Sequence, residues 1–372
     1  MYNFSFQNID KDEFLRKYWQ KAPCLFKAAF PSPANYLTAD ELAGFALDED
    51  VESRLIQFKP EKQQWSIEHG PLSQDIFQHL PESNWTLLIQ SIDSWLPATQ
   101  NLLEHFSFIP RWRFDDIMVS YATDQGGVGP HCDNYDVFLI QGEGQRHWRV
   151  GAKGQVGKQT KIIDGLSHLD SFDPIIDVVM QPGDMLYVPP ETAHWGVSVG
   201  ESIGYSIGYR SIQSNQLLAL LTEHLSENVE AKDFFADDYR SNSNHKNRID
   251  PQVTKWAQQE LIKLSKQPEL ITELISRQLS HSKLGLFSES EHPNIQELSK
   301  NSFIQLNKEL GVNWWINQDK VVLNIEGESF VFEKYLITAI EKLANFERCS
   351  LHLFKKPPKA VDFPVDLTNL IN

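Results

Sequence analysis

Residues 127–138 read GVGPHCDNYDVF, a glycine-rich loop followed by the start of an apolar run. Such a pattern predicts a turn that leads into a β-strand. Side chains at positions i and i+2 of a strand lie on the same face. His131 and Asp133 can therefore bind one ion, while Cys132 points the other way.

The strand pattern continues around this stretch, between Trp112 and Arg210. Short runs rich in Val, Ile, Tyr and Trp alternate there with turns rich in Gly, Pro and Asp. The runs lie at residues 117–121, 137–141, 147–150, 185–188 and 203–207. Many short strands at close spacing predict an antiparallel barrel or jelly roll.

A second segment, residues 182–194 (PGDMLYVPPETAH), reads as a turn, a short strand, a rigid proline loop and a histidine. An antiparallel barrel can place this strand beside the first, although 61 positions separate Asp133 from His194. Two histidines and one carboxylate on one face form the facial triad of non-haem ferrous enzymes. We therefore predict that His131, Asp133 and His194 bind Fe(II).

His131 and Asp133 form an HxD pattern, a histidine followed two positions later by an aspartate. The same pattern occurs a second time, at His168 and Asp170. This copy lies in a turn-rich stretch with no strand pattern before it, and only 26 positions before His194. We favour the first copy because it follows a strand and a glycine-rich loop. Asp136 is a nearby alternative carboxylate, but strand parity puts it on the opposite face.

Helical patterns flank the strand-rich region. They lie at residues 12–19, from 39, 89–106 (interrupted by Pro97), 252–266, 268–279, 293–310 and 335–344. The apolar stripe 217–221 is a candidate dimer contact, and the polar residues 241–247 are predicted to form a loop. Near the C-terminus, runs at 321–325 and 329–332 flank an acidic turn, which is a hairpin signal. Helices followed by a hairpin predict a small winged-helix-like module.

Charge and cysteine usage restrict the classes of partner and compartment. The 372 residues include 34 Lys or Arg and 50 Asp or Glu, a net charge of −16. This balance argues against a wide nucleic-acid-binding surface and permits a basic protein partner. Residues 268–372 are also acidic, with 11 basic and 14 acidic residues, so we expect no direct DNA binding.

The cellular compartment is predicted from the cysteine usage and from the features of a secreted or membrane protein that the sequence lacks. Three distant cysteines, Cys24, Cys132 and Cys349, suggest no disulfide framework. No apolar stretch approaches the roughly 20 residues of a membrane helix, and acidic residues stand where a signal peptide would be basic. We therefore expect a cytoplasmic protein without membrane contact.

The stretch 127–138 resembles the JmjC-type 2-oxoglutarate oxygenases. Within them it is most similar to the bacterial ribosomal oxygenases, which are arginine hydroxylases of the sixteenth large-subunit ribosomal protein. Residues 18–23 (YWQKAP), 182–194 and 205–210 (YSIGYR) fit the same pattern. The resemblance extends over nearly the whole chain, because this subfamily also has a helical dimerisation region and a C-terminal winged-helix domain.

The resemblance implies a mostly α+β protein built on a double-stranded β-helix, a jelly-roll barrel of the cupin and JmjC type. The implied oxygenase domain spans residues 1–211, with N-terminal helical elements and the barrel at about 112–210. A helical dimerisation region at 212–266 and a winged-helix-like domain at 267–372 follow.

The family's site residues are carried over position by position. Its iron ligands fall on His131, Asp133 and His194, with 2-oxoglutarate and dioxygen as co-substrates and no catalytic residue beyond the metal ligands. The basic residue that holds the far carboxylate of 2-oxoglutarate matches Arg146, in preference to Arg149. If Glu143-Gly144 is a two-residue turn, Arg146 faces the same way as Val137 and Leu139, and a three-residue turn would reverse this.

A hydroxyl group on the preceding strand helps to hold the same carboxylate in this family. Ser120 matches that position best, with Tyr121 and Thr123 as neighbours. Tyr205 and Ser206, on the last barrel strand, are candidates to line the pocket.

The implied activity is hydroxylation of Cβ of an arginine in the ribosomal protein, by a cytoplasmic homodimer. A guanidinium group needs carboxylates or carbonyls around it, and Asp115, Asp116 and Asp136 are unassigned candidates. Two alternatives stay open. One is a JmjC-type oxygenase with another substrate, either a lysine demethylase or a small-molecule oxygenase, and the other is a non-catalytic barrel that acts as a binding module.

Overall fold

The computed structural model describes residues 10–30, 36–155, 157–163, 166–228, 235, 249, 251–282, 303–308 and 310–353. The chain divides into two compact units, Met1–Ser211 and Ile212–Asn372. The loop predicted at 241–247 and most of the helix predicted at 293–310 lie outside the described residues. The further division at residue 267 stays a prediction.

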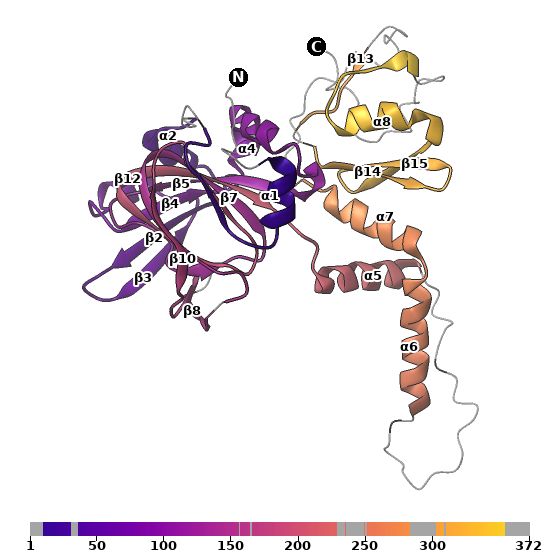
Figure 1. The fold of residues 1–372 in the computed structure, drawn as a ribbon, viewed down its shortest axis with the longest axis horizontal. Helices are drawn as coiled ribbons and strands as arrows, with labels where there is room; N and C mark the ends of the chain where they lie inside the picture. The colour runs from indigo at the N-terminus through magenta and orange to yellow at the C-terminus, as the bar shows by residue number, and fades with distance from the viewer. Residues whose placement is uncertain are drawn as a thin grey trace. The chain divides into compact units, whose positions relative to one another are not determined.

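The first unit is built on a ten-stranded antiparallel sheet that curls into a barrel (Figure 1). Its main path runs β1-β11-β7-β12-β5-β4-β2-β3, with β10 paired to β7 and β6 paired to β12. The strands are β1 Cys24–Phe26, β2 Ser53–Lys59, β3 Gln64–His69, β4 Trp85–Ile89, β5 Phe114–Ala122, β6 His131–Cys132, β7 Asp136–Gly151, β10 Pro174–Met180, β11 Met185–Val188 and β12 Ala193–Tyr209. A separate pair consists of β8 Gln159–Ile163 and β9 Leu166–Leu169. The predicted antiparallel barrel core is confirmed.

The turn considered at Glu143-Gly144 is wrong, because β7 is one continuous strand that pairs with β12 on both sides of it. Glu143 pairs with Ile203 and Gln141 with Gly204, so Gly142 is an extra residue that forms a bulge. Gly144 has a φ of +61°, and a Cβ there would lie 1.9 Å from the Glu201 carbonyl oxygen. Glycine is therefore required for a close strand approach rather than for a hairpin.

The first two helices of the first unit begin at residues whose side chains cap them. Asp10 accepts a hydrogen bond from Glu13 N at the start of α1 (Lys11–Lys17). Thr38 and Glu41 form a capping box on α2 (Ala39–Phe45). These caps and the apolar spacing explain why both helices form where the sequence predicts them. The remaining helices are α3 Gln74–Gln78, η1 Pro97–Phe106, η2 Arg111–Arg113 and α4 Ile92–Trp95.

The single helix predicted at 89–106 is wrong. Ile89 ends β4, where it is fully buried and pairs with Ser53 and Val119. Only α4 is an α-helix, and the 3₁₀ helix η1 begins at Pro97, whose ring removes a backbone donor. Strand pairing and the proline therefore override the helical periodicity.

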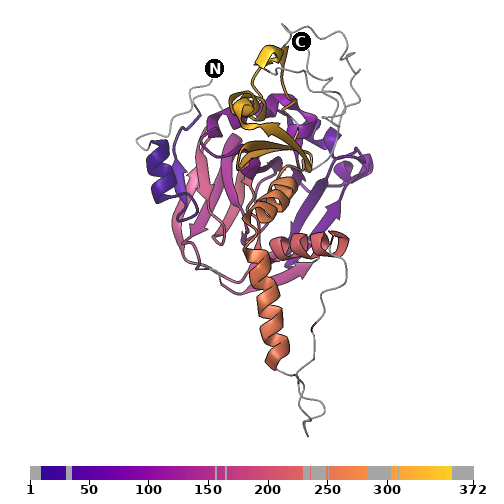
Figure 2. The same cartoon turned by 90° about the vertical axis from the view of Figure 1, so that its right-hand side faces the viewer.

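The described part of the second unit contains the four α-helices α5 to α8 and a three-stranded sheet (Figure 2). The helices α6 (Pro251–Ser265) and α7 (Pro268–Leu279) confirm two predictions, and α5 (Ser214–Asn228) contains the apolar stripe. The sheet has β14 Val312–Asn317, β15 Lys320–Ile325 and β16 Glu328–Glu333, followed by η4 Lys334–Leu336 and α8 Ile337–Ala344. The pairing of β15 with β16 across Glu326-Gly327 confirms the predicted hairpin.

The end of the helix predicted at 293–310 is wrong where it is described. Phe303–Ile304 form β13, which pairs with β17 (Cys349–Ser350) ahead of η5 (Leu351–Leu353). Ile304 and Cys349 are both buried in the core of this unit, so burial of the short strand outweighs the local helical pattern. No helix in the described parts of the chain is long and apolar enough to cross a membrane.

Candidate metal centre

Three predicted metal-binding side chains meet at the start of β12. His131, on β6, pairs directly with His194, the second residue of β12. One nitrogen from each histidine and one carboxylate oxygen of Asp133 all lie within 4.8 Å of one another. The Asp133 Oδ2 atom is 3.8 Å from His131 Nε2 and 3.5 Å from His194 Nε2. Strand pairing thus brings together residues that are 61 positions apart.

Backbone carbonyls orient both imidazole rings. The Nδ1 atom of His131 lies 2.9 Å from Gly129 O, and that of His194 lies 2.9 Å from Thr192 O. A carbonyl can only accept, so each Nδ1 carries the proton and donates it. The Nε2 atoms are therefore the ones near Asp133, and in a neutral ring each is free to bind a metal.

The charges in the cluster favour the metal-binding forms of His131 and Asp133. Burial, reinforced by His194, lowers the pKa of His131 to about 4, so this ring is neutral at pH 7. Burial acts to raise the pKa of Asp133, but His131 and His194 outweigh it and lower the pKa to about 2. Burial also acts to lower the pKa of His194, yet the hydrogen bond to Asp133 leaves it raised. Asp133 is therefore an anion at neutral pH.

The second HxD copy supports the first one instead of forming a site. His168 Nε2 is 2.8 Å from Val128 O, and its ring packs edge-on against Trp65. A Cβ on Gly129, whose φ is +79°, would lie 2.2 Å from that ring. His168 therefore packs on the loop that leads into His131. Among the described residues, the cluster of His131, Asp133 and His194 is the only group of three such side chains close enough to share an ion.

Arg146 lies in a pocket between the strands of the barrel, where it is only 9% exposed. Its Nη1 donates to Ser120 Oγ at 2.9 Å and its Nη2 donates to Ser202 Oγ at 3.0 Å. Nε has no partner, and no described carboxylate pairs with this guanidinium. Burial lowers its pKa to about 10, which still leaves it charged at neutral pH. A buried cation without a counter-ion is costly, so the pocket suits an anion.

This pocket adjoins the metal-binding cluster. It is lined by Ser120, Leu139, Ile140, Gln141, Arg146, Trp148, Met180, Gly204, Tyr205 and Ser206. The Trp148 ring lies 6.1 Å from the His194 ring and so connects the two. In a regular strand, residues seven positions apart lie on opposite faces. The bulge at Gly142 adds one residue between Leu139 and Arg146, so both lie on the same face and line the pocket.

The other predicted residues lie in different surroundings. Tyr121 packs against Trp85, and Thr123 Oγ1 is hydrogen-bonded to Trp85 O. Arg149 stacks over Trp195 and lies 3.8 Å from the carboxylate of Asp177. These three predicted residues are therefore outside the pocket lining.

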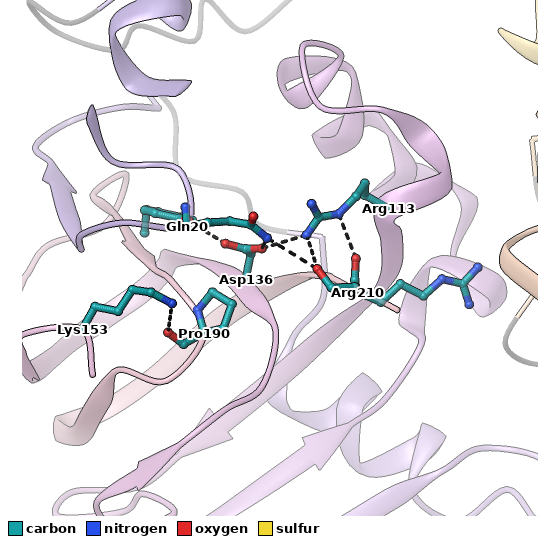
Figure 3. A network of polar contacts seen from close by, with 8 residues as sticks. Gln20, Arg113, Asp136, Lys153, Pro190 and Arg210 are labelled. Atoms are coloured by element: carbon teal, nitrogen blue, oxygen red, sulfur yellow. Dashed lines mark hydrogen bonds and ion pairs between the residues drawn. The ribbon is translucent and has the colours of Figure 1, made fainter. Parts of the chain in front are cut away.

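Asp136 and Asp116 are also outside the cluster of metal-binding groups. Asp136 is buried and bonded to Gln20 and Arg113 (Figure 3). Asp116 is buried and accepts hydrogen bonds from Gln90 and Ser91.

Sequence reasoning missed Ser202, Trp148 and Gly204. A usable signal was present, because Ser202, Gly204, Ser206 and Gly208 repeat small residues with the period of two expected for one face of a strand. Trp148 follows Arg146 by two positions and shares its face for the same reason. Gly196 leaves room for it, since a Cβ there would lie 2.7 Å from the Trp148 ring.

Comparison with known proteins agrees with this geometry. The family profile described as JmjC domain matches residues 101–217, so the barrel and its cluster are of the JmjC class. The ribosomal protein uL16 3-hydroxylase of Escherichia coli (strain K12) is 35% identical over 271 residues, which are 73% of this chain and 71% of that protein. The chain belongs to the family of JmjC-type ribosomal oxygenases.

Solved structures extend the similarity to almost the full length. An X-ray structure of E. coli ycfD superposes with a TM-score of 0.79 at 30% identity, covering 98% of this chain and 95% of that one. The E. coli ribosomal oxygenase YcfD in complex with cobalt and 2-oxoglutarate superposes with a TM-score of 0.76 at 29% identity, covering 95% and 93%.

Proposed function

We propose that this chain is an Fe(II)- and 2-oxoglutarate-dependent dioxygenase that hydroxylates Cβ of an arginine in ribosomal protein uL16. The observation that carries this proposal is the position of Arg146 near a cluster of two histidines and one aspartate. Arg146 is buried, and no described carboxylate pairs with its guanidinium. The relative named ribosomal protein uL16 3-hydroxylase supports the substrate. The related YcfD complex with cobalt and 2-oxoglutarate supports the cofactors.

The donor set fits ferrous iron. His131 and His194 offer imidazole nitrogens and Asp133 offers a carboxylate, which is the 2-His-1-carboxylate set of non-haem Fe(II) oxygenases. No thiolate lies in the cluster, because Cys132 is not one of its members. These three residues would hold the iron, and no further catalytic residue is needed. When bound, iron and 2-oxoglutarate supply the oxidising chemistry, in which oxidative decarboxylation to succinate accompanies insertion of one oxygen atom into a C–H bond.

The pocket residues would bind and orient the co-substrate. Arg146 and Ser120 would hold the far carboxylate of 2-oxoglutarate, since a guanidinium forms directional, charge-assisted hydrogen bonds. Ser202 gives the same guanidinium a second hydroxyl partner and so limits its rotation. Leu139, Met180 and Trp148 form apolar walls of the pocket, which would limit the access of water to the bound co-substrate.

A basic partner fits the charge of this protein. The net charge of −16 resides mainly in the residues of the first unit, which include 16 basic and 28 acidic side chains. An RNA-binding ribosomal protein carries the opposite charge, and complementary charge raises the rate of encounter. The protein would act in the cytoplasm, where such a partner is made.

The second unit would supply dimerisation and a winged-helix-like module. The helices α5 and α6, within residues 212–266, expose Leu218, Leu261 and Ile262 by 51% to 61%, which supports a homodimer contact there. The helix α8 and the β15–β16 hairpin, within residues 267–372, support the winged-helix comparison. The hairpin turn carries Glu326 and Glu328, which argues against DNA contact. Light scattering of the full chain tests the dimer.

Intact-mass analysis of purified uL16 tests the activity. The enzyme is loaded without oxygen with Fe(II) and 2-oxoglutarate and is then exposed to air. A gain of about 16 mass units with matching succinate is expected, and fragmentation locates the oxygen on an arginine. Loss of a methyl group from a lysine in a methylated substrate would instead identify a demethylase. Succinate without any change in uL16 would leave an oxygenase with another substrate. Neither product from the iron-loaded enzyme would favour the binding-module alternative.

A further inference from the structure

Asp136 is a fully buried carboxylate at the start of β7, three positions after Asp133. Its Oδ2 accepts hydrogen bonds from Arg113 Nη2 at 2.9 Å and Gln20 Nε2 at 3.0 Å. Its Oδ1 accepts one from the Tyr187 hydroxyl at 2.5 Å. Figure 3 shows Gln20 and Arg113 converging on this carboxylate from different segments of the chain.

The bond between Asp136 and Tyr187 joins β7, which begins shortly after Asp133 in the chain, to β11, which ends shortly before His194. Tyr187 lies on β11, which pairs with β7 through Tyr187–Phe138 and Val188–Val137. The chain reaches Asp133 three residues before Asp136, and it reaches His194 seven residues after Tyr187. One hydrogen bond therefore ties the ends of both ligand-bearing segments.

Backbone contacts continue this connection to the cluster. The amide of Glu191, in the loop before His194, donates to Asp133 O at 2.9 Å. Lys153 Nζ donates to Pro190 O at 3.2 Å (Figure 3). Gly154 N donates to Glu191 O at 2.8 Å. The loop that leads into His194 is thus attached both to the turn just after β7, at Lys153 and Gly154, and to the backbone of Asp133.

The partners of Asp136 are themselves held in place. Arg113 also donates to Arg210 O at 2.9 Å and to Ser211 Oγ at 2.7 Å, and its guanidinium lies over the Trp19 ring. Trp19 stacks on Tyr187, with ring centroids 5.6 Å apart. Gln20 N donates to the Tyr187 hydroxyl at 2.7 Å. Because each buried group would lose its partner if another moved, such a network resists local displacement.

We propose that Asp136 is a positioning residue of the metal centre, which sets the spacing between the segments that carry Asp133 and His194. This inference rests on the proposed metal-binding role of the cluster. Metal affinity depends on ligand placement within a fraction of an ångström, and loss of groups behind the ligands weakens binding about 10- to 100-fold. Arg146 shares no hydrogen bond with this network, so 2-oxoglutarate binding to metal-saturated enzyme should be spared.

Titration of the full chain with Co(II), followed by visible absorption, tests the proposal. Asp136→Asn keeps the shape of the side chain but removes its charge and the acceptor for one partner. We expect it to weaken Co(II) binding at least about tenfold, while the KM for 2-oxoglutarate at saturating metal changes less than about twofold. Leu102→Ala, a cavity variant in η1, is the control for stability loss alone, and its Co(II) affinity should stay within about twofold of the parent. Equal Co(II) affinities of Asp136→Asn and Leu102→Ala at a similar melting temperature would overturn the proposal.

Two further variants keep the outcomes distinct. One outcome is that the parent protein binds no Co(II), or binds it no more tightly than the Asp133→Ala variant does. In either case the proposed metal centre is wrong, and the positioning role of Asp136 is wrong as well. If Asp136→Asn does not fold, Tyr187→Phe is tested in its place. The phenylalanine keeps the ring that stacks on Trp19 and lacks only the hydroxyl group that donates to Asp136. We expect about two- to fivefold weaker Co(II) binding from that variant. An unchanged affinity would contradict the positioning role.

Discussion

Arg146 reaches Ser120 across an intervening strand, with 2.9 Å between its Nη1 and the serine Oγ. Arg146 lies on β7 and Ser120 on β5, and β12 lies between them in the sheet. The contact passes over Gly204, where a Cβ would lie 3.5 Å from each of the two atoms. A glycine in the middle strand therefore allows a long cation and a hydroxyl to form one anion site.

Arg146→Ala should raise the 2-oxoglutarate concentration needed for half-maximal turnover by roughly 10- to 100-fold. The estimate corresponds to the loss of hydrogen bonds to a charged group. Metal binding should persist, because the three metal-binding groups are untouched. Succinate formation against 2-oxoglutarate concentration is the measurement. Arg149→Ala, which removes an arginine stacked on Trp195 outside the pocket, is the matched control. An unchanged requirement in Arg146→Ala would move the role to another residue.

Gly204→Ala should weaken 2-oxoglutarate binding about three- to tenfold. The new methyl group fits at ordinary contact distance but occupies space above the Ser120 hydroxyl, where the ligand would lie. Isothermal titration of the metal-loaded protein measures this. Gly44→Ala is the control, since a Cβ there meets nothing within 4 Å and the residue lies in helix α2. The same affinity in both variants would show that the ligand does not contact this strand.

His131→Ala and Asp133→Ala should each abolish iron binding and turnover. Either change leaves two ligands of three, and the remaining groups cannot complete the facial set. Metal content after gel filtration and succinate yield are the measurements. Asp170→Asn, in the other HxD pair, is the control. The Asp170 side chain is exposed and accepts a hydrogen bond from the Thr160 hydroxyl, so its replacement should leave metal binding unchanged. Near-normal turnover in either alanine variant is incompatible with the ligand assignment.

Asp93→Asn should stabilise the protein at pH 8, and the gain should disappear toward pH 4. Burial raises the pKa of Asp93 to about 6, even though Ile117 N donates to its carboxylate. An unfolded aspartate has a pKa of about 3.9. The folded state therefore binds the proton more tightly, so its stability is greatest below about pH 4 and falls as the pH rises through 6.

The size of this effect follows from the difference in pKa. About two pKa units correspond to roughly 3 kcal/mol in the free energy of unfolding at pH 8, which is the upper limit of the gain. Urea unfolding of both proteins at pH 8, 6 and 4.5 measures the difference. Asp75→Asn, at an exposed carboxylate, should differ little from the parent at every pH. A constant difference for Asp93→Asn across this range would contradict the shifted pKa.

Much of the barrel was predictable because its signals are local. The strand periodicity between residues 112 and 210, the turns rich in glycine and proline, and the HxD motif all act over fewer than about ten residues. The same holds for α6, α7 and the β15–β16 hairpin. The errors arose where distant partners decide the outcome. Ile89 joins a strand because Ser53 and Val119 flank it, and β7 continues through Gly144 because β12 runs beside it.

The sequence alone favoured His131 and Asp133, since they follow a strand pattern and a glycine-rich loop, although the structure ends β6 at Cys132 and places Asp133 just beyond it. It also indicated Arg146 and Ser120 through the family resemblance. Only the tertiary structure decided that β6 pairs with β12 and brings His194 to them, that a bulge at Gly142 turns Arg146 inward, and that Ser202 and Trp148 line or support its pocket. These relations depend on pairing register and on bulges between strands far apart in the chain, and neither is encoded in a short stretch of residues.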